Sequence, residues 1–283
     1  TTSEGIWLLD AAHCTTFINA SFTDLLGYTL DEMLGKPALE LIPVESHLQI
    51  EACLNRSRDG VGGQYECPLI ARNGNEIWTL LSTNPILDNH GSYAGTLVML
   101  TNITVRKQME ESLRRLSTQD SLTGLFNRRH FFTLAEQEFE RSQRYGRPLA
   151  LLMLDIDHFK KINDQHGHLV GDEVLQVAAR IMHDTLRRVD VLARYGGEEF
   201  VMLLPETTLL TAMTIANRLC TALATEPIVT GQGTVSMTAS IGVAVLTDNI
   251  NQTLTELLGR ADQALYHAKQ AGRNQVQSHR SVV

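Results

Sequence analysis

The first third of the chain combines alternating apolar and polar residues with turn signals, a pattern that predicts strands. Residues 64–71 alternate in this way, and Asn73-Gly74 is a strong hairpin signal before the next run. Residues 19–35 predict helical structure that is interrupted at glycines. The predicted strands are 7–10, 16–19, 64–71, 76–87 and 93–101. The pattern therefore indicates an antiparallel sheet with short helices.

Residues 104–118 predict one helix that connects this part to the rest of the chain. Met109, Leu113 and Leu116 are spaced by four and then three positions, as in a short coiled-coil seam. A helix that lies on its own domain has the same spacing, so the pattern leaves both interpretations open.

From Asp120 onwards, predicted strands and helices alternate. Apolar residues recur on one face of 170–186, which is typical of an amphipathic helix, and 149–154 is an apolar run typical of a strand. The other predicted helices are 131–144, 211–225 and 254–271, and the other predicted strands are 191–193, 201–204 and 238–246. This order predicts an α+β fold with helices packed on one face of a sheet.

Length and charge narrow the class of protein. A chain of 283 residues suits two domains, and its apolar runs of about six residues are too short to span a membrane, which takes roughly 20. Residues 1–104 carry 12 Asp and Glu against 4 Lys and Arg, whereas the remainder carries 20 of each. The net charge of −8 therefore lies in the first part, which argues against a nucleic-acid surface there. The neutral second part can gather basic groups around a phosphorylated small molecule.

The spacing of the cysteines and the first residues of the sequence bear on the cellular location of the protein. The four cysteines show no disulfide or metal-binding spacing, which indicates reduced thiols in the cytoplasm. No signal peptide is visible, and because the sequence starts at Thr1, an upstream membrane or sensor segment stays open.

Residues 195–200, Tyr-Gly-Gly-Glu-Glu-Phe, place two carboxylates at a hairpin tip. Glu198 and Glu199 follow a Gly-Gly turn between two apolar runs. Upstream, Asp155 ends an apolar strand and can bind a divalent cation, with the Ile156 carbonyl nearby. Taken alone, Asp155 could be a helix N-cap, and the hairpin tip a solvated loop. In combination, they match the way nucleotidyl-transfer enzymes hold two metal ions.

The segment 155–172 carries groups that suit a nucleotide. Backbone amides around His158 and Phe159 can meet phosphates at a helix start, and Lys160 adds a positive charge. A carboxylate such as Asp172 can accept from guanine N1–H and the 2-amino group, donors that adenine lacks. The simpler alternatives are a helix N-terminal charge for Asp172 and a turn residue for Asn163.

These motifs resemble the GGDEF family of diguanylate cyclases, in its Gly-Gly-Glu-Glu-Phe variant. The resemblance implies that two GTP are joined into cyclic di-GMP with release of two pyrophosphates. Each domain would hold one GTP, so two chains would meet as a homodimer. The expected metal is Mg²⁺ or Mn²⁺, held by Asp155, Ile156, Glu198 and Glu199. The expected catalytic residues are Asp155, Lys160, Glu198 and Glu199, with Glu198 open as metal ligand or as base.

The resemblance also assigns the groups that bind substrate and product. Asn163 and Asp172 are expected to recognise the guanine base. Lys269 and Arg273 are expected to bind the triphosphate; they lie four positions apart and are expected on one face of the last helix. The alternative is that they are the basic residues of an ordinary helix C-terminus. The sequence Arg187-Arg188-Val189-Asp190 resembles the family's product-inhibition site, with Arg187 and Asp190 on cyclic di-GMP and Arg218 as a further contact.

The remaining resemblance concerns the domain organisation. Residues 120–129 match the family's entry motif, which is expected to dock the connector and organise the nucleotide site. The implied cyclase domain is a palm-like α/β sandwich over 119–283, preceded by a helical connector over 105–118.

The first part, 1–104, resembles a PAS sensor domain. The motifs that carry this resemblance are Asn19-Ala20-Ser21-Phe22, Leu26-Gly27-Tyr28, Leu34-Gly35-Lys36, Arg72-Asn73-Gly74, Trp78 and Asn102-Ile103-Thr104. The PAS ligand is unknown; haem would need a proximal histidine, for which His47 is the candidate. The expected function is a diguanylate cyclase under PAS and product control. The alternatives are a non-catalytic receptor for GTP or cyclic di-GMP and a sensory or interaction protein.

Overall fold

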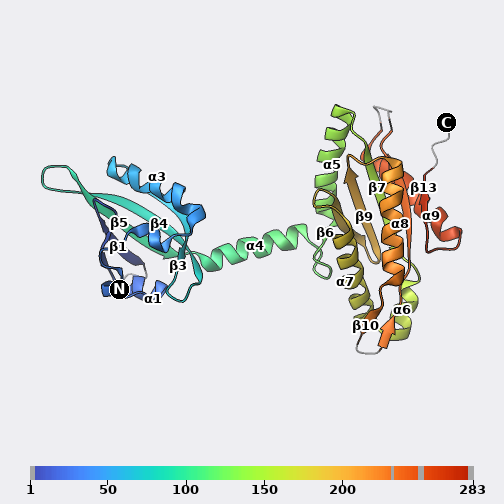
Figure 1. Cartoon of the computed structure of the whole chain (residues 1–283), viewed down its shortest axis with the longest axis horizontal. Helices are drawn as coiled ribbons and strands as arrows, with labels where there is room; N and C mark the ends of the chain where they lie inside the picture. The colour runs from blue at the N-terminus through green and yellow to red at the C-terminus, as the bar shows by residue number, and fades with distance from the viewer. Residues whose placement is uncertain (1–3, 231–232, 248–251, 280–283) are drawn as a thin grey trace. The chain divides into compact units, whose positions relative to one another are not determined.

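The computed structural model describes residues 4–230, 233–247 and 252–279. The ends of the two expected domains, 1–3 and 280–283, lie outside this range. The chain forms two compact units, residues 1–113 and 114–283, each built around its own sheet (Figure 1).

The first unit is a five-stranded antiparallel sheet in the order β2-β1-β5-β4-β3. Its strands are β1 (Gly5–Asp10), β2 (Thr15–Ile18), β3 (Gly63–Ile70), β4 (Glu76–Leu87) and β5 (Tyr93–Asn102). Its helices are α1 (Ala20–Leu26), α2 (Leu30–Met33), α3 (His47–Arg58) and the 3-10 turns η1 (Ala38–Leu41) and η2 (Val44–Ser46). The hairpins and the broken helix predicted from the sequence are confirmed.

The helix breaks in this unit have local causes. The Asn19 side chain accepts from the amides of Phe22 and Ile6, so it caps α1 and ties the helix to β1. Gly27 ends α1 with φ of 79°, a left-handed conformation that favours glycine. The apolar faces of the sheet and helices then bury one core, in which Trp7, Phe22, Leu69 and Leu100 are fully buried.

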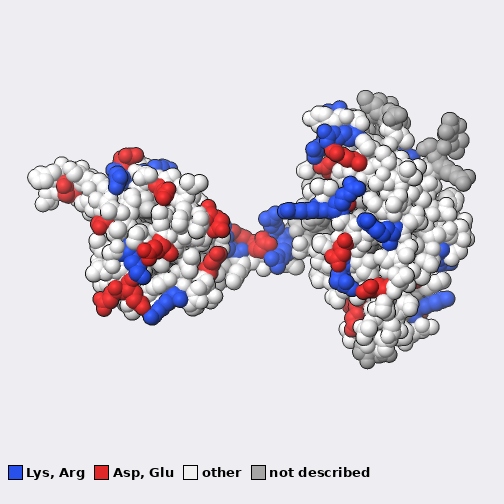
Figure 2. Space-filling model, in the orientation of Figure 1, with Lys and Arg blue, Asp and Glu red and all other residues white. Residues whose placement is uncertain are grey.

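Helix α4 (Thr104–Thr118) covers the predicted connector, and the division between the units falls within it. Asn102 Oδ1 accepts from the Thr104 amide at 2.9 Å and caps the helix start. Glu66 of β3 pairs with Arg106 and Lys107, and both signs of charge line the helix (Figure 2). The helix buries no residue; its exposed apolar residues are Val105, Met109, Leu113 and Leu116.

The second unit is a six-stranded sheet in the order β13-β12-β7-β9-β8-β6. Its strands are β6 (Phe126–Asn127), β7 (Leu149–Ile156), β8 (Val191–Gly196), β9 (Glu199–Pro205), β12 (Ala239–Val245) and β13 (Val276–Ser278). The four central strands pair antiparallel, and β6 and β13 run parallel to their neighbours at the edges. A short hairpin of β10 (Ile228–Thr230) and β11 (Gly233–Val235) lies outside this sheet.

Helices cover both faces of this sheet, so the expectation of helices on one face is wrong. The helices are α5 (Arg128–Tyr145), α6 (Phe159–His166), α7 (His168–Thr185), α8 (Leu209–Thr225) and α9 (Leu254–Gln270). One core cluster joins β7 to α7 and α8, and another joins β7 to α5 and α9 (Figure 1). All eight residues of β7 are buried because successive side chains enter opposite cores. The fold is therefore an α/β sandwich, as the resemblance implied.

Among the described residues, no helix combines the length and apolar character that crossing a membrane requires.

Candidate active site

The ends of β7 and β9 bring three predicted residues together. Asp155 pairs in register with Glu199, the first residue of β9. The Ile156 amide donates to the Glu198 carbonyl at 3.3 Å. Gly197 makes the intervening turn with φ of 51°, which a glycine adopts without strain. Asp155, which lies 43 and 44 positions before Glu198 and Glu199 in the sequence, thus comes beside them where two central strands of a buried sheet end.

The charges at this edge are poorly compensated. Asp155 is only 8% exposed, and its Oδ2 lies 2.8 Å from Lys269 Nζ on α9. Burial raises the pKa of Asp155 above its usual range; the Lys269 bond opposes this, and the charges of Glu198 and Asp157 add to it. Burial likewise raises the pKa of Glu199, helped by the charge of Asp155. A cation bound here would relieve both carboxylates.

The donors at this edge fit a magnesium or manganese ion. Asp155, Glu198 and Glu199 offer the hard carboxylate oxygens that these ions prefer. No group of three or more His, Cys, Asp or Glu is arranged to hold a metal within the described ranges. Mg²⁺ commonly binds through one or two carboxylates, with water and substrate phosphates completing its shell. An incomplete protein shell therefore suits a metal that arrives with a nucleotide.

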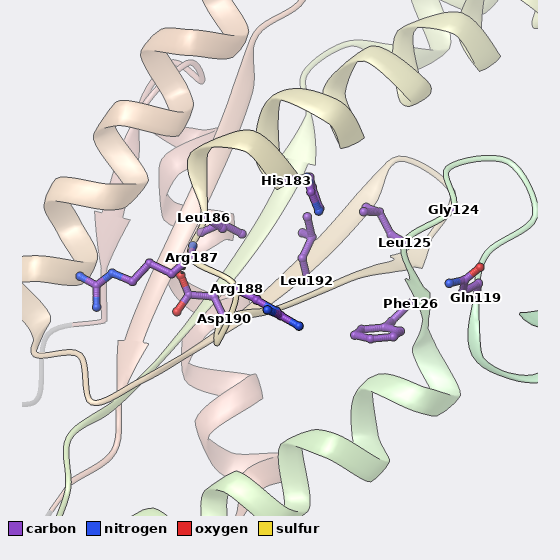
Figure 3. A pocket seen from close by; sticks show the side chains of 10 residues that line it. All are labelled: Gln119, Gly124, Leu125, Phe126, His183, Leu186, Arg187, Arg188, Asp190 and Leu192. Atoms are coloured by element: carbon purple, nitrogen blue, oxygen red, sulfur yellow. Dashed lines mark hydrogen bonds between the residues drawn. The ribbon is translucent and has the colours of Figure 1, made fainter. Parts of the chain in front are cut away.

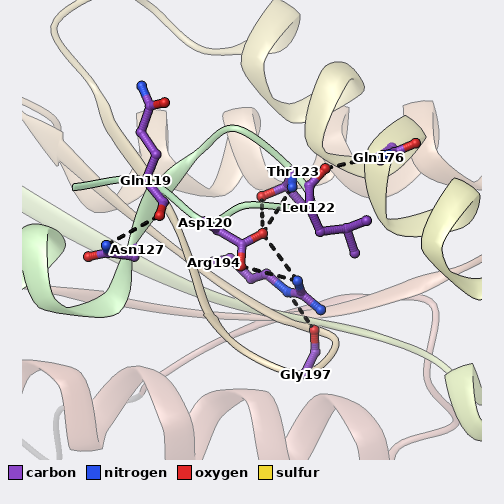
Figure 4. Close-up of polar contacts among 8 residues, drawn as sticks. All are labelled: Gln119, Asp120, Leu122, Thr123, Asn127, Gln176, Arg194 and Gly197. Atoms are coloured by element: carbon purple, nitrogen blue, oxygen red, sulfur yellow. Dashed lines mark hydrogen bonds and ion pairs between the residues drawn. The ribbon is translucent and has the colours of Figure 1, made fainter. Parts of the chain in front are cut away.

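The hairpin tip is held by Arg194, a residue that none of the sequence motifs singled out. Its Nε donates to the Gly197 carbonyl at 2.9 Å, and its guanidinium lies 3.1 and 3.2 Å from the two carboxylate oxygens of Asp120 (Figure 4). Asp120 also accepts from the amide and hydroxyl of Thr123. Burial alone would raise the pKa of Asp120, but these bonds outweigh it and lower the pKa. The entry motif is thereby joined to the carboxylate hairpin.

The same motif also contacts the end of the connector helix. The Asn127 side-chain amide donates to the carbonyls of Ser117 and Gln119, and its Oδ1 caps α5. The entry motif therefore makes contacts of the kind expected for docking the connector.

The start of α6 brings together the predicted phosphate and base contacts. His158 precedes the helix with φ of 57°, and among the described residues no side chain caps this end. Lys160 is exposed in the first turn. Within the described part of the chain, Asn163 Oδ1 is buried without a hydrogen-bond partner, and a Cβ at position 171 would lie only 1.9 Å from it, so any larger residue at Gly171 would have to displace the Asn163 side chain. The exposed Asp172 follows on α7.

The basic pair at the end of the chain is arranged differently from the expectation. Lys269 lies on α9, but the helix ends at Gln270, so placing Arg273 on the same helix face is wrong. Gly272, Arg273 and Asn274 have φ of 116°, 63° and 44°, three left-handed residues that turn the chain toward β13. Gly272 starts this reversal because it carries no Cβ to clash. Arg273 is exposed on the turn.

Arg187 and Asp190 lie on the turn between α7 and β8. The Arg187 amide donates to Asp190 Oδ2 at 2.8 Å, and Asp190 Oδ1 is buried with no hydrogen-bond partner among the residues that the structure describes. Burial raises the pKa of Asp190, while the amide and charge of Arg187 oppose the shift. Arg218 of α8 donates to the Thr185 carbonyl at 2.6 Å, which places it beside this turn.

The turn borders a cavity of about 610 Å³ (Figure 3). The lining includes Phe126, His183 and Leu192 together with the turn residues. Arg187 and Arg188 point in opposite directions in Figure 3. The side chains of these two adjacent arginines therefore lie on different sides of the turn.

Comparison with known proteins agrees with this geometry. Residues 117–275 match the family model described as diguanylate cyclase, GGDEF domain, and residues 1–103 match the PAS fold. The chain belongs to the GGDEF family of diguanylate cyclases. Diguanylate cyclase DgcM of Escherichia coli is 41% identical over 180 residues, which are 64% of this chain and 43% of DgcM. Diguanylate cyclase DgcP of Pseudomonas aeruginosa is 44% identical over 167 residues, 59% of this chain and 25% of DgcP.

A solved structure gives the same result for the fold. The coiled coil and GGDEF domain of DgcB from Caulobacter crescentus, in complex with c-di-GMP, superposes with a TM-score of 0.58 at 30% identity. The match covers 62% of this chain and 91% of that one. The chain spans less than half the length of these two curated relatives.

Within the GGDEF domain, Asp157 is the second residue that sequence reasoning left without a role. It is 4% exposed and accepts hydrogen bonds from Thr238, Ser240 and Asn274. Its position two residues after Asp155 was the available signal, but its partners lie 81 to 117 positions away.

In the PAS domain, the histidine singled out for haem is engaged by the fold. His47 Nε2 lies 2.8 Å from the Ile42 carbonyl, so this ring nitrogen already has a partner. The haem interpretation therefore gains no support. Trp78, one of the residues that carry the PAS resemblance, is half-buried with Lys107 Nζ 5.1 Å from its ring centroid.

Proposed function

We propose that this protein is an active diguanylate cyclase that joins two GTP into cyclic di-GMP and releases two pyrophosphates. The observation that carries the proposal is that Asp155 is paired in register with Glu199 and that the Asp155 carboxylate also contacts Lys269. Enzymes that transfer phosphoryl groups need clustered carboxylates for metal and positive charge for phosphate at one place. GTP as substrate would put the reaction in the cytoplasm.

The proposal gives each residue at these strand ends a role in the reaction. Asp155, the Ile156 carbonyl, Glu198 and Glu199 would hold Mg²⁺ or Mn²⁺. When bound, the metal lowers the pKa of the 3′-hydroxyl and offsets charge at the α-phosphate. The 3′-oxygen of one GTP bonds to the α-phosphorus of the other, and the bond to pyrophosphate breaks. Glu198 takes the hydroxyl proton or serves as a ligand only; both roles remain open.

Phosphate and base are held at opposite ends of the nucleotide. The amides at His158 and Phe159, together with Lys160, would bind phosphate at the start of α6. Lys269 and Arg273 would bind the remainder of the triphosphate. Asn163 and Asp172 would read guanine, the exposed Asp172 carboxylate accepting the donors that adenine lacks.

Control is proposed at two places outside the reacting groups. Cyclic di-GMP would bind at Arg187 and Asp190, with Arg218 beside them. Asp190 Oδ1, which has no hydrogen-bond partner in the described ranges, is a suitable acceptor for guanine donors. The PAS domain would act through α4, whose exposed seam at Met109 and Leu113 would pair with a second copy. Pairing matters because each domain holds only half of the substrate pair.

The test is production of cyclic di-GMP from GTP by the purified chain in Mg²⁺ buffer. Glu198→Ala and Glu199→Ala should nearly abolish it while the circular dichroism spectrum is unchanged. Glu140→Gln, on the exposed face of α5, changes the charge equally and should keep wild-type activity. Binding of GTP without turnover by the wild type would refute catalysis and support the receptor alternative.

A further inference from the structure

Asp157 is a buried carboxylate that the proposed reaction does not use. It follows the last residue of β7, and its own amide donates to the Thr238 carbonyl at 2.8 Å. It is 4% exposed, and no ion pair to it is found in the described ranges. A buried carboxylate without a cation must be satisfied by hydrogen bonds, so its donors show what it organises.

Three donors converge on this carboxylate. Ser240 Oγ donates to Oδ1 at 2.7 Å, while Thr238 Oγ1 and the Asn274 backbone amide donate to Oδ2 at 2.8 and 3.0 Å. Two donors come from the start of β12 and the third from the turn after α9. Asp157 therefore joins the end of β7, the adjacent strand and the Arg273 turn.

The Arg273 turn needs such an anchor. Arg273 and Asn274 are both left-handed, a conformation that sterics disfavour for residues with a Cβ, Arg more than Asn. The Arg273 amide donates to the Ala268 carbonyl at 3.1 Å, which holds the incoming side of the turn to α9. On the outgoing side, the Asn274 amide is held by Asp157 and the Gln275 carbonyl by the Ile241 amide.

We infer that Asp157 is a positioning residue for the triphosphate. It fixes the Arg273 turn relative to Asp155, which leaves the same strand two residues earlier, so the phosphate contact and the metal carboxylate share one rigid support. The inference rests on the proposed function, in which Arg273 contacts the triphosphate. It assigns to Asp157 no contact with substrate.

The test compares ligands with and without a triphosphate. Asp157→Asn has the same shape, but it loses the negative charge and keeps one acceptor oxygen where the carboxylate offers two to its three donors. Affinity is measured by calorimetry for 3′-deoxyGTP, which lacks the reacting hydroxyl, and by NMR titration for guanosine. We expect 3′-deoxyGTP to bind about tenfold more weakly, the effect of about one charge-assisted hydrogen bond, and guanosine to bind unchanged. Asp184→Asn, an exposed change of the same charge, should alter neither affinity.

A double variant tests whether Asp157 acts through Arg273. Arg273→Ala should also weaken 3′-deoxyGTP binding, and Asp157→Asn added to it should cause no further loss. Independent, additive losses would overturn the inference, as would equal weakening of guanosine and 3′-deoxyGTP by Asp157→Asn. If the wild type makes no cyclic di-GMP, the proposed function itself fails, which is a separate result.

Milder variants decide the matter if Asp157→Asn does not fold. Thr238→Val removes a donor to Oδ2, the oxygen that also holds Asn274, whereas Ser240→Ala removes the donor to Oδ1. Thr238→Val should weaken 3′-deoxyGTP binding more than Ser240→Ala does. Equal or unchanged affinities in these two folded variants would overturn the inference.

Discussion

Replacing Arg194 by Met should release the hairpin tip that carries Glu198 and Glu199. The guanidinium makes two contacts with the Asp120 carboxylate, at 3.1 and 3.2 Å, and one with the Gly197 carbonyl at 2.9 Å. The two side chains are 17% and 22% exposed, so water screens the pair only in part. Met keeps the apolar stem of the arginine and removes its donors.

The expected cost follows from what is left behind. A hydrogen bond to a charged group contributes about 1.5–3 kcal/mol, and Asp120 keeps its two Thr123 bonds after the change. We therefore expect Arg194→Met to lower the free energy of unfolding of the GGDEF domain by about 2 kcal/mol. Cyclic di-GMP production should fall further than stability explains, because the carboxylates lose their fixed position.

The assay is a double-mutant cycle of Arg194→Met and Asp120→Asn, followed by denaturant unfolding of the full chain. The coupling energy should be about 1–2 kcal/mol, against about 0.5 kcal/mol or less for the exposed Arg180–Glu226 pair. The pKa of Asp120 is lower in the folded state than in the unfolded state. The stability that the Asp120 carboxylate contributes is therefore fully present above its unfolded pKa and is lost as the pH falls through its folded pKa. Losses that simply add, or coupling that persists in acid, would refute the link.

Three further predictions address substrate, product and assembly. Asp172→Ser should relax the preference for GTP over ATP in a competition assay; an unchanged preference contradicts guanine reading by this carboxylate. Burial raises the pKa of Asp190, so acidification protonates this acceptor early, and calorimetry should show cyclic di-GMP affinity falling as pH falls through that pKa. Asp190→Asn should bind weakly with little pH dependence, and a wild-type pH profile in that variant would exclude Asp190 as the acceptor. Leu113→Asp should reduce dimer mass by light scattering and activity per chain at low concentration, whereas wild-type values at every concentration would make α4 a passive tether.

The central strands, and the carboxylates at the ends of two of them, were predictable because their signals are local. The apolar run of β7 ends at Asp155, and β8 joins β9 through the two-residue turn Gly197-Glu198 rather than Gly196-Gly197, with Gly196 paired opposite Glu199. A two-residue turn leaves little freedom in the register of β8 and β9, so Glu198 and Glu199 could be placed at the hairpin tip from the sequence. The position of β7 beside this hairpin was an expectation from the resemblance. The same reasoning went wrong on helix placement, although the six-residue apolar run at the start of β7 already indicated a sheet buried on both faces.

The features that sequence reasoning missed depend on distant partners. Strands β6 and β13 have two and three residues, too few to show a periodicity, and each pairs parallel with an edge formed elsewhere in the chain. Arg194 finds Asp120 74 positions away, and Asp157 finds Asn274 117 positions away. Arg194 carries no local mark that separates it from an ordinary surface charge, and the position of Asp157 two residues after Asp155 does not reveal its donors. Only the folded sheet brings their partners within reach.

The groups proposed for reaction and for feedback are built on different kinds of support. Asp155 and Glu199 stand on paired strands in the middle of the sheet, where a shift of one strand would displace both cores. Arg187 and Asp190 stand on a turn after α7, held mainly by bonds to each other. A substitution at Arg187 or Asp190 can therefore change the proposed product binding without moving the carboxylates. A substitution at Asp157 or Arg194 would instead shift the ends of the strands that carry Asp155 and Glu199. The two proposed sites can therefore be altered separately within the same domain.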